Sequence, residues 1–332
     1  MRTNRERGGA LLIVLWLSAA LGAIALSVAT TVRSEAEHAS TVSEGLRAHY
    51  LATGALERAV QWLFWGPSVR DGQGKPRFWD PRNPRMVMTF PSGNAIVEMI
   101  PETAKLNVNF APAADLLAVV KAVSGDDNKA REITEGILHW RQGGAASPLD
   151  GFYSGLGSTF RPRRASLEEI EELLSVRGIT PELFYGNYIA GEQGQLYPRG
   201  GLRDCLSVWG SIGPFDVNGA SPALLEALGV NPADVQRIVA QRAQRPFLDM
   251  NEVRGMGVTN PRLRVGGNSM WTLRATARLR RPDGTPSEVI RSSSATVKYW
   301  SDQMRHPTPV QIVRYYEDAW SEFSIKPGGA QK

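Results

Sequence analysis

The stretch Gly9–Val32, GALLIVLWLSAALGAIALSVATTV, is an uninterrupted run of 24 residues without a charged side chain. As an α-helix it would be about 36 Å long, which is enough to cross a hydrocarbon core of about 30 Å. It follows a short leader, residues 1–8, in which three arginines oppose one glutamate. This positive bias predicts a cytoplasmic N-terminus, with the remaining chain on the far side of the membrane.

A cleaved secretion signal is the alternative interpretation, because Ser18-Ala19-Ala20 and Ala23-Ile24-Ala25 resemble small-residue cleavage sites. Two observations favour a retained anchor: the run is longer than a typical signal core, and no helix breaker follows it. Apolar or small side chains then recur every three to four residues, at Val42, Leu46, Tyr50, Thr53, Leu56, Val60 and Leu63. We therefore expect one helix from about residue 10 to 65, lipid-embedded and then amphipathic, ended by Gly66 and Pro67.

Composition excludes several classes of site. The 332 residues carry 38 basic and 33 acidic side chains, a net charge of +5, which permits acidic partners without requiring nucleic acid. Cys205 is the single cysteine, so no intrachain disulfide can form. The four histidines are scattered and form no HExxH motif, which argues against a zinc site.

Strand signals lie at both ends of the region beyond the helix. Met86–Phe90 and Asn94–Ile100 flank Pro91-Ser92-Gly93, which predicts a hairpin. Three further strands are expected near the C-terminus, the first two joined by a turn containing Asp-Gly: Trp271–Arg280, Ser287–Trp300 and Val310–Tyr316. Helical signals dominate the region between these two groups.

An internal repeat is the most informative feature of that helical region. The segment 105–117 matches 214–225: in each, a short extended piece ends in Val-Asn and a helix begins soon after. A second helix follows in each copy, at Ala130–Gln142 and at Pro232–Gln244. Each copy then carries a third element, ending in Leu-Ser-Val-Arg-Gly-Ile-Thr or Val-Arg-Gly-Met-Gly-Val-Thr. We expect Asn109 and Asn218 to close a turn or to hold free N–H groups near the helix starts.

Two helices joined by a short glycine turn resemble helix-hairpin-helix units, which often bind DNA through backbone N–H groups and nearby basic side chains. Arg237, Arg242, Arg245 and Arg254 fit that interpretation superficially. Behind a membrane anchor, on the outer side, duplex DNA is an improbable ligand, so we favour a structural or protein-binding role.

The sequence contains no convincing catalytic constellation: the phosphate-binding GxxxxGK[ST] and the nucleophile-elbow GxSxG motifs are both absent. Leu149–Arg164 is expected to be a loop, and Glu168–Leu174 a helix with a Ser166–Glu169 capping box. Cys205 is expected in a buried strand. Four aspartates could contribute to a calcium site, although none has EF-hand spacing: Asp126, Asp127, Asp204 and Asp216.

Several of these motifs together resemble the type II secretion minor pseudopilin K family (general secretion pathway protein K), over about residues 5–300. They are the basic leader ending in Gly, the run Gly9–Trp16, the Asn-Val-Asn and Ala-Pro element at 107–112, the segment 172–180, and the Asp-Val-Asn-Gly-Ala-Ser element at 216–221. The individual motifs are weak, whereas their order and spacing are specific.

The resemblance implies an α+β fold in which a pilin-like α/β domain with an antiparallel sheet is interrupted by a large α-helical insertion of SAM or helix-hairpin-helix type. The expected N-terminal divisions are a prepilin leader at 1–8 and the N-terminal helix at 9–65, whose transmembrane part is 9–32. The pilin-like domain is expected in two parts, at 66–108 and 205–325, separated by the insertion at 109–204. The second part contains a second helix-hairpin-helix-like unit at 214–260, and a flexible tail follows at 326–332.

The resemblance also implies processing by prepilin peptidase, with cleavage between Gly8 and Gly9 and methylation of the new N-terminus. Cleavage between Gly9 and Ala10 is the alternative. Pilins usually carry Glu at the fifth mature position, where it can neutralise the N-terminal amine of a neighbouring subunit within the lipid. Here that position is Ile13, or Val14 under the alternative cut, which suits a subunit that sits first, at the filament tip.

As a family member, the protein would be a non-enzymatic, single-pass inner-membrane protein with most of its chain in the periplasm. It would cap a short pseudopilus for export of folded proteins. Its implied partners are the I-type and J-type minor pseudopilins, the major pseudopilin, prepilin peptidase and the inner-membrane assembly platform. Some family members bind calcium, but no ligand can be matched residue by residue. A membrane-anchored periplasmic DNA-binding protein is the alternative function.

Overall fold

The computed structural model describes residues 6–66, 69–80, 83–142, 148–157, 159–190, 196–300, 310–317 and 319. Its helices are α1 (Glu6–Trp65), η1 (Glu102–Ala104), α2 (Ala113–Ser124), α3 (Asp127–Arg141), α4 (Pro148–Leu156), η2 (Ile170–Ser175), α5 (Pro181–Tyr185), α6 (Leu202–Cys205), α7 (Pro222–Ala227), α8 (Pro232–Gln244) and α9 (Met250–Gly255). Its strands are β1 (Arg85–Phe90), β2 (Gly93–Pro101), β3 (Leu106–Asn107), β4 (Asn187–Ala190), β5 (Leu196–Arg199), β6 (Leu206–Ser207), β7 (Phe215–Asp216), β8 (Leu263–Arg264), β9 (Met270–Arg280), β10 (Pro286–Tyr299) and β11 (Val310–Tyr316).

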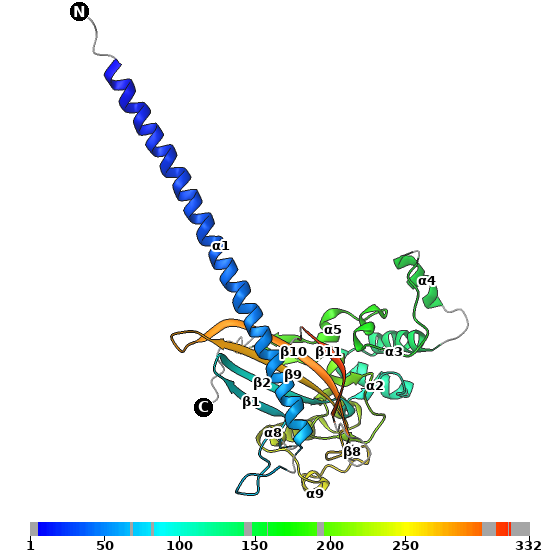
Figure 1. Cartoon of the computed structure of the whole chain (residues 1–332). Coiled ribbons are helices and arrows are strands. Elements are labelled where there is room, and N and C mark those ends of the chain that lie inside the picture. Colours follow the sequence, from blue (N-terminus) through cyan, green and yellow to red (C-terminus); the bar gives the residue numbers. More distant parts are fainter. Residues whose placement is uncertain are drawn as a thin grey trace, which may run out of the picture.

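The predicted long helix is confirmed: α1 is continuous over 60 residues, a length of about 90 Å. Its N-terminal half projects away from the molecule, and its C-terminal half lies across the sheet (Figure 1). The helix ends where Gly66 adopts a positive φ of 69°, a left-handed conformation that glycine reaches without steric cost. The Gly66 N–H donates to the Trp62 carbonyl at 3.1 Å, which satisfies one of the terminal carbonyls.

Five antiparallel strands form the main sheet, in the order β1-β2-β9-β10-β11. The predicted hairpin is confirmed, because β1 pairs with β2 and the Phe90–Gly93 pair closes it. The three C-terminal strands are also confirmed at nearly the expected bounds. β2 pairs with β9 although the whole of residues 102–269 separates them in the chain, so the helical region is an excursion from the middle of this sheet.

Small residues let α1 lie close to the sheet. Ala48, Ala52, Ala55 and Ala59 recur along one face of the helix and are fully buried. They belong to one core with the sheet alanines, Ala95, Ala275, Ala277 and Ala295. Leu56 and Leu63 fill the remaining space, and burial of each such side chain contributes about 1.5–3 kcal/mol.

The helical region between β2 and β9 has its own hydrophobic core, to which both copies of the repeat contribute. Each copy contains a parallel two-stranded ladder and a helical hairpin: β3–β6 with α2–α3, and β7–β8 with α7–α8. The domain boundaries expected from the sequence remain predictions. The structure adds that the two repeats share one core.

The same types of residue form the turn between the two helices in both helical hairpins. Gly125 follows α2 and Gly229 follows α7, with φ values of 70° and 86°. The next helix is capped in each case by a side-chain oxygen: Asp126 accepts from Asn128 N at 2.8 Å, and Asn231 accepts from Ala233 N at 2.9 Å. A left-handed glycine followed by an Asx N-cap is the local signal that specifies a tight helical hairpin.

Two local expectations are wrong. Leu149–Arg164 is not a loop throughout, because α4 forms there and buries Tyr153 against Trp140 at a ring distance of 5.6 Å. The helix expected at Glu168–Leu174 does form, as the 3₁₀ helix η2 (Ile170–Ser175). Its cap is not Ser166–Glu169: the Glu172 carboxylate reaches back to accept from the backbone N–H of Glu169 at 3.1 Å.

Cys205 is buried as expected, but it ends the short helix α6 instead of lying in a strand. Strand β6 begins at the next residue, Leu206. The pattern of apolar residues around Cys205 could not distinguish these outcomes, since a buried helical turn and a buried strand are equally apolar.

Candidate functional site: the projecting helix and the repeat clamps

The projecting half of α1 presents apolar side chains on all sides. Within the described residues, α1 is the one helix long and apolar enough to cross a membrane, and none of its apolar window is buried. Its exposed large residues include Leu11, Leu12, Leu15, Trp16, Leu17, Leu21, Ile24, Leu26, Val28 and Val32. A helix that is hydrophobic all round, with no protein around it, suits lipid or the helices of other subunits.

The predicted processing and packing residues lie in this projecting part. Gly8 and Gly9 are in the first turns of α1, and a Cβ placed at Gly9 would meet nothing within 4 Å. Ile13 and Val14 are 67% and 64% exposed. Gly9, Ile13 and Val14 therefore lie clear of the folded part of the chain, while the roles of all four positions in cleavage and assembly remain predictions.

Beyond the lipid-length segment, the amphipathic half of α1 has two apolar faces rather than one. Leu56 and Leu63 face the sheet, as the spacing predicts. Val42, Leu46 and Tyr50 face away from it, with exposures of 58%, 55% and 66%. These three residues, separated by four positions each, form a stripe along one side of the helix, hereafter the outer stripe. The single-face prediction is wrong for them: Val42 precedes the part of α1 that the sheet covers, and Leu46 and Tyr50 lie on the side of the helix opposite the buried Gly45 and Ala48.

The two repeat asparagines act as long-range clamps, not as helix caps. Asn109 accepts from Leu167 N at 2.7 Å and donates to Leu167 O at 2.9 Å. Asn218 accepts from Phe247 N at 2.9 Å and donates to Phe247 O at 3.0 Å. Each side-chain amide therefore pairs with both the backbone N–H and the backbone C=O of one distant residue, as a neighbouring strand would. The same pairing in both copies confirms that the sequence repeat is a structural one.

An arginine in the second helix of each repeat holds the turn before the first helix. Arg141 donates to Val108 O at 2.6 Å and Ala111 O at 2.7 Å. Arg242 donates to Val217 O at 2.8 Å and Ala220 O at 2.6 Å. Removal of these guanidinium groups from water lowers the pKa of both arginines. The guanidinium of Arg242 therefore binds backbone carbonyls of its own chain and not a DNA phosphate.

The other basic residues considered for DNA binding also have partners within the chain. Arg237 forms an ion pair with Asp234, and Arg245 lies 3.1 Å from Glu252. Arg254 donates to Asn251 at 3.2 Å. The Arg237 and Arg254 pairs each lie within one helix, and the Arg245 pair joins the end of α8 to α9, so the four arginines do not form one free basic surface.

The four aspartates considered as calcium ligands each interact with other groups of the chain. Asp126 caps α3, and Asp127 pairs with Lys121 at 2.8 Å. Asp204 accepts from Gly201 N at 2.9 Å. Asp216 accepts from Asn218 N and Gly266 N, both at 3.1 Å. Among the described residues no group of three or more His, Cys, Asp or Glu side chains could hold a metal ion.

Cys205 lies fully inside the helical core. Its Sγ is 3.0 Å from Ser221 Oγ, and burial raises the pKa of the thiol to about 12. A thiol in that state is protonated at neutral pH and is a poor nucleophile.

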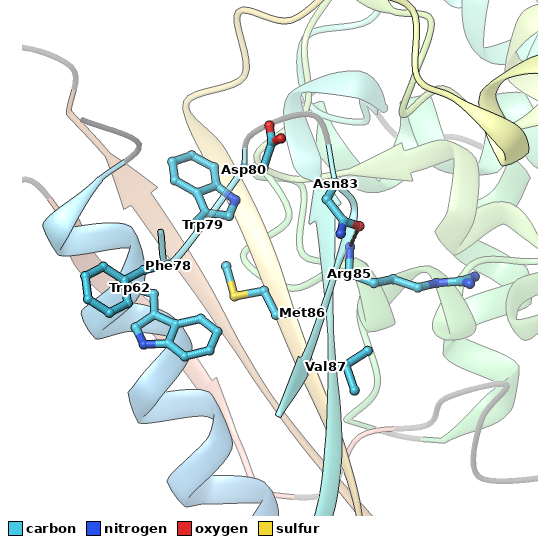
Figure 2. A pocket seen from close by; sticks show the side chains of 8 residues that line it. All are labelled: Trp62, Phe78, Trp79, Asp80, Asn83, Arg85, Met86 and Val87. Carbon is cyan, nitrogen blue, oxygen red and sulfur yellow. Dashed lines mark hydrogen bonds between the residues drawn. The ribbon is translucent and has the colours of Figure 1, made fainter. Parts of the chain in front are cut away.

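Two hollows lie at the end of the sheet farthest from the projecting part of α1. The larger has a volume of about 390 Å³ and lies between the ends of β2, β9 and β10 and the second repeat. The smaller, of about 180 Å³, lies between the end of α1 and β1. In Figure 2, Met86 points toward Trp62 and Phe78 while Arg85 extends the opposite way, as strand alternation requires. Trp79 lines both hollows. No sequence pattern predicts either hollow, because their walls come from segments far apart in the chain.

Comparison with known proteins identifies the fold. No protein-family model and no curated protein matches the sequence. Among solved structures, the chain is similar to one in the GspK-GspI-GspJ complex of the enterotoxigenic Escherichia coli type 2 secretion system, with a TM-score of 0.50 and 17% sequence identity. The match covers 87% of this chain and 99% of that chain. The predicted α+β architecture is thereby confirmed: this chain has the fold of GspK.

Proposed function

We propose that this protein is a K-type minor pseudopilin of a type II secretion system, with a structural rather than a catalytic role. The observation that carries the proposal is the architecture of α1. One continuous helix supplies a membrane-length apolar rod and then the main packing element of an antiparallel sheet. The GspK fold supports the same assignment.

We infer that the partners are I-type and J-type minor pseudopilins, because the similar solved structure is a complex of GspK with GspI and GspJ. The outer stripe supports this part of the proposal. Val42, Leu46 and Tyr50 extend the apolar surface of α1 beyond the lipid-length segment, where water would otherwise surround them. Packing against a neighbouring helix would remove their apolar surface from water.

The residue at the fifth mature position supports the proposed tip position. A subunit that joins beneath another can pair its fifth-position carboxylate with the charged N-terminal amine of the subunit above, since an unpaired charge in lipid costs about 3 kcal/mol or more. Ile13 has no carboxylate to neutralise that amine. The chain is therefore suited to the first position, with no subunit above it, and to initiating assembly of the filament.

The N-terminus of mature protein tests the assignment. Mass spectrometry of the full chain, from cells with and without prepilin peptidase, should give an N-methylated Gly9 only when the peptidase is present. Gly8→Ala should block this cleavage, whereas the matched Gly22→Ala, which lies inside the apolar run, should not. A chain cleaved near residues 20–25, or unprocessed in both strains, would contradict the proposal.

Co-purification tests the partner surface. Leu46→Arg should reduce recovery of the I-type and J-type partners with the full chain, because it places a charge on the outer stripe. Gln61→Arg changes an exposed residue of the same helix outside that stripe and should leave recovery unchanged. Equal recovery of the partners with both variants would show that the outer stripe is not part of the interface.

A further inference from the structure

Strand β1 leaves one edge of the main sheet open. It stands first in the strand order and pairs with β2 on one side only. On that side, Met99 N donates to Pro84 O at 2.8 Å, just before β1 begins. Every second residue of an antiparallel strand bonds to a given neighbour. The even-numbered residues of β1 therefore bond to β2, and Val87 and Thr89 direct their N–H and C=O groups away from it.

These outward backbone groups have no partner among the described residues. No hydrogen bond joins another described group to Val87 or Thr89 on that side, and both residues are exposed. The neighbouring outward N–H, of Arg85, is bonded to Asn83 Oδ1 at 3.0 Å. The other edge strand, β11, pairs through a shifted register, a bulge of the kind that hinders further pairing. The edge at β1 is thus a template for an added strand.

The smaller hollow lies at this open edge. It is lined by Met86 and by Val87, whose side chains point to opposite faces of the sheet. Because β2 occupies the other side of β1, a hollow that touches both residues lies at the free edge. Toward α1 its wall includes Trp62, Phe78 and Met86 (Figure 2). A cavity of about 150 Å³ can hold benzene, so a hollow of about 180 Å³ accepts one aliphatic side chain.

A positive charge lies on the same face, farther along β1. The guanidinium of Arg58 is 4.4 Å from the centre of the Phe90 ring. Phe90 is four residues from Met86 and points to the same face, about 14 Å along the strand. Arg58 is exposed, and no ion pair joins it to a carboxylate of the described residues. A carboxylate beside Phe90 would therefore meet a cation that has no acidic partner in the described chain.

We propose that β1 binds an extended segment of another polypeptide as an added antiparallel strand, with an acidic residue followed four positions later by an aliphatic one. Every pair in this sheet is antiparallel. In that orientation the acidic residue lies opposite Phe90, beside Arg58, and the aliphatic residue lies opposite Met86, at the hollow. Main-chain hydrogen bonds to Val87 and Thr89 hold the segment. A second copy of β1 does not fit, because its sequence, RMVMTF, has no acidic residue.

The proposal does not depend on the pseudopilin assignment and is tested on the full chain in lipid nanodiscs. The probe is a fluorescein-labelled peptide, Thr-Glu-Thr-Val-Thr-Leu-Thr, and binding is followed by fluorescence anisotropy. One control peptide has Lys in place of Glu. A second is N-methylated at the two threonines that would lie opposite Thr89 and Val87, which blocks their hydrogen bonds and keeps every side chain. The wild-type chain should bind the Glu peptide more tightly than either control.

Variants of the chain test the charge and the strand pairing separately. Arg58→Glu should weaken binding of the Glu peptide about threefold or more and should make the Lys peptide the tighter ligand. Arg47→Glu, at an exposed arginine of the same helix 11 residues earlier, is the control and should keep the wild-type preference. Val87→Pro removes one outward N–H, and an edge strand tolerates proline there. It should weaken binding about two- to tenfold, the value of one hydrogen bond.

Hydrogen exchange reports the pairing directly. The Val87 and Thr89 amides should exchange rapidly in the free chain and slowly with the Glu peptide, whereas the Val97 amide, within β2, should be slow in both. Far-UV circular dichroism confirms that each variant is folded. The proposal is overturned if the wild-type chain does not bind the Glu peptide, if the N-methylated peptide binds equally well, or if Arg58→Glu keeps the wild-type preference. Dimerisation of the chain that Val87→Pro abolishes would place a second copy at this edge and would also overturn it.

Discussion

Asn109 binds the backbone of Leu167 through both ends of its side-chain amide, at 2.7 Å and 2.9 Å, across 58 residues of chain. This contact attaches the third element of the first repeat to the start of its first helix. Asn218 and Phe247 repeat the arrangement in the second copy. The clamp therefore explains why both copies keep Val-Asn at this point.

Asn109→Ala is expected to lower the free energy of unfolding by about 2 kcal/mol, because it leaves a backbone N–H and a carbonyl of Leu167 without partners. Urea denaturation of the full chain in detergent measures the loss. Asn109→Asp, which keeps an acceptor but no donor, should fall between Ala and wild type. Asn128→Ala, at an exposed site, is the control and should stay within about 0.5 kcal/mol.

Arg242→Met is expected to destabilise the second repeat by about 2 kcal/mol, since the Val217 and Ala220 carbonyls both lose a charged donor. Arg237→Met removes an exposed helix-surface pair and should cost less than about 1 kcal/mol. The same denaturation experiment compares them. If the two variants were equally stable, Arg242 would have no structural role beyond that of a surface arginine.

The buried carboxylate of Glu102 should make stability depend on pH in the acid range. Burial by itself would raise the pKa of this group. The Lys105 charge and the hydrogen bonds from Ser207, Thr272 and Lys105 outweigh burial and hold the pKa below its ordinary value of 4.5. Lys105 Nζ and Thr272 Oγ1 donate to the same Glu102 oxygen, at 3.0 Å and 2.7 Å.

Because the pKa is lower in the folded chain, the ionised form of Glu102 stabilises the fold above pH 4.5, and that contribution is lost as pH falls through the lowered pKa. Glu102→Gln should therefore flatten the dependence of the thermal midpoint on pH below 4.5. Glu57→Gln, on the exposed face of α1, is the control and should leave the profile unchanged. A Glu102→Gln profile parallel to wild type would contradict this assignment.

Cys205 should resist alkylation while the chain is folded. Burial raises its pKa to about 12, so almost none of the reactive thiolate is present at pH 8. Labelling with iodoacetamide, followed by intact-mass measurement, should be negligible in buffer and complete in urea. Rapid labelling of the folded chain would show that the helical core opens readily.

Regular elements could be predicted where one chemical pattern dominates. The hairpin of β1 and β2 and the three C-terminal strands follow from strand residues bounded by turn residues. The helical hairpins follow from their glycine turns and apolar spacing. In contrast, α4 was missed because its stability comes from the burial of Tyr153 against Trp140, a contact that its own Gly-rich sequence does not reveal.

The sequence by itself determined the apolar N-terminal half of α1, the helical repeat and the strand-forming segments. These features depend on local composition and on residue spacing along one element. Tertiary structure decided which face of α1 meets the sheet, which distant peptide each asparagine binds, and that Trp79 and Trp271 share a cavity. These relationships join residues far apart in the chain. Their free energy depends on three-dimensional contact, which spacing within a single element does not encode.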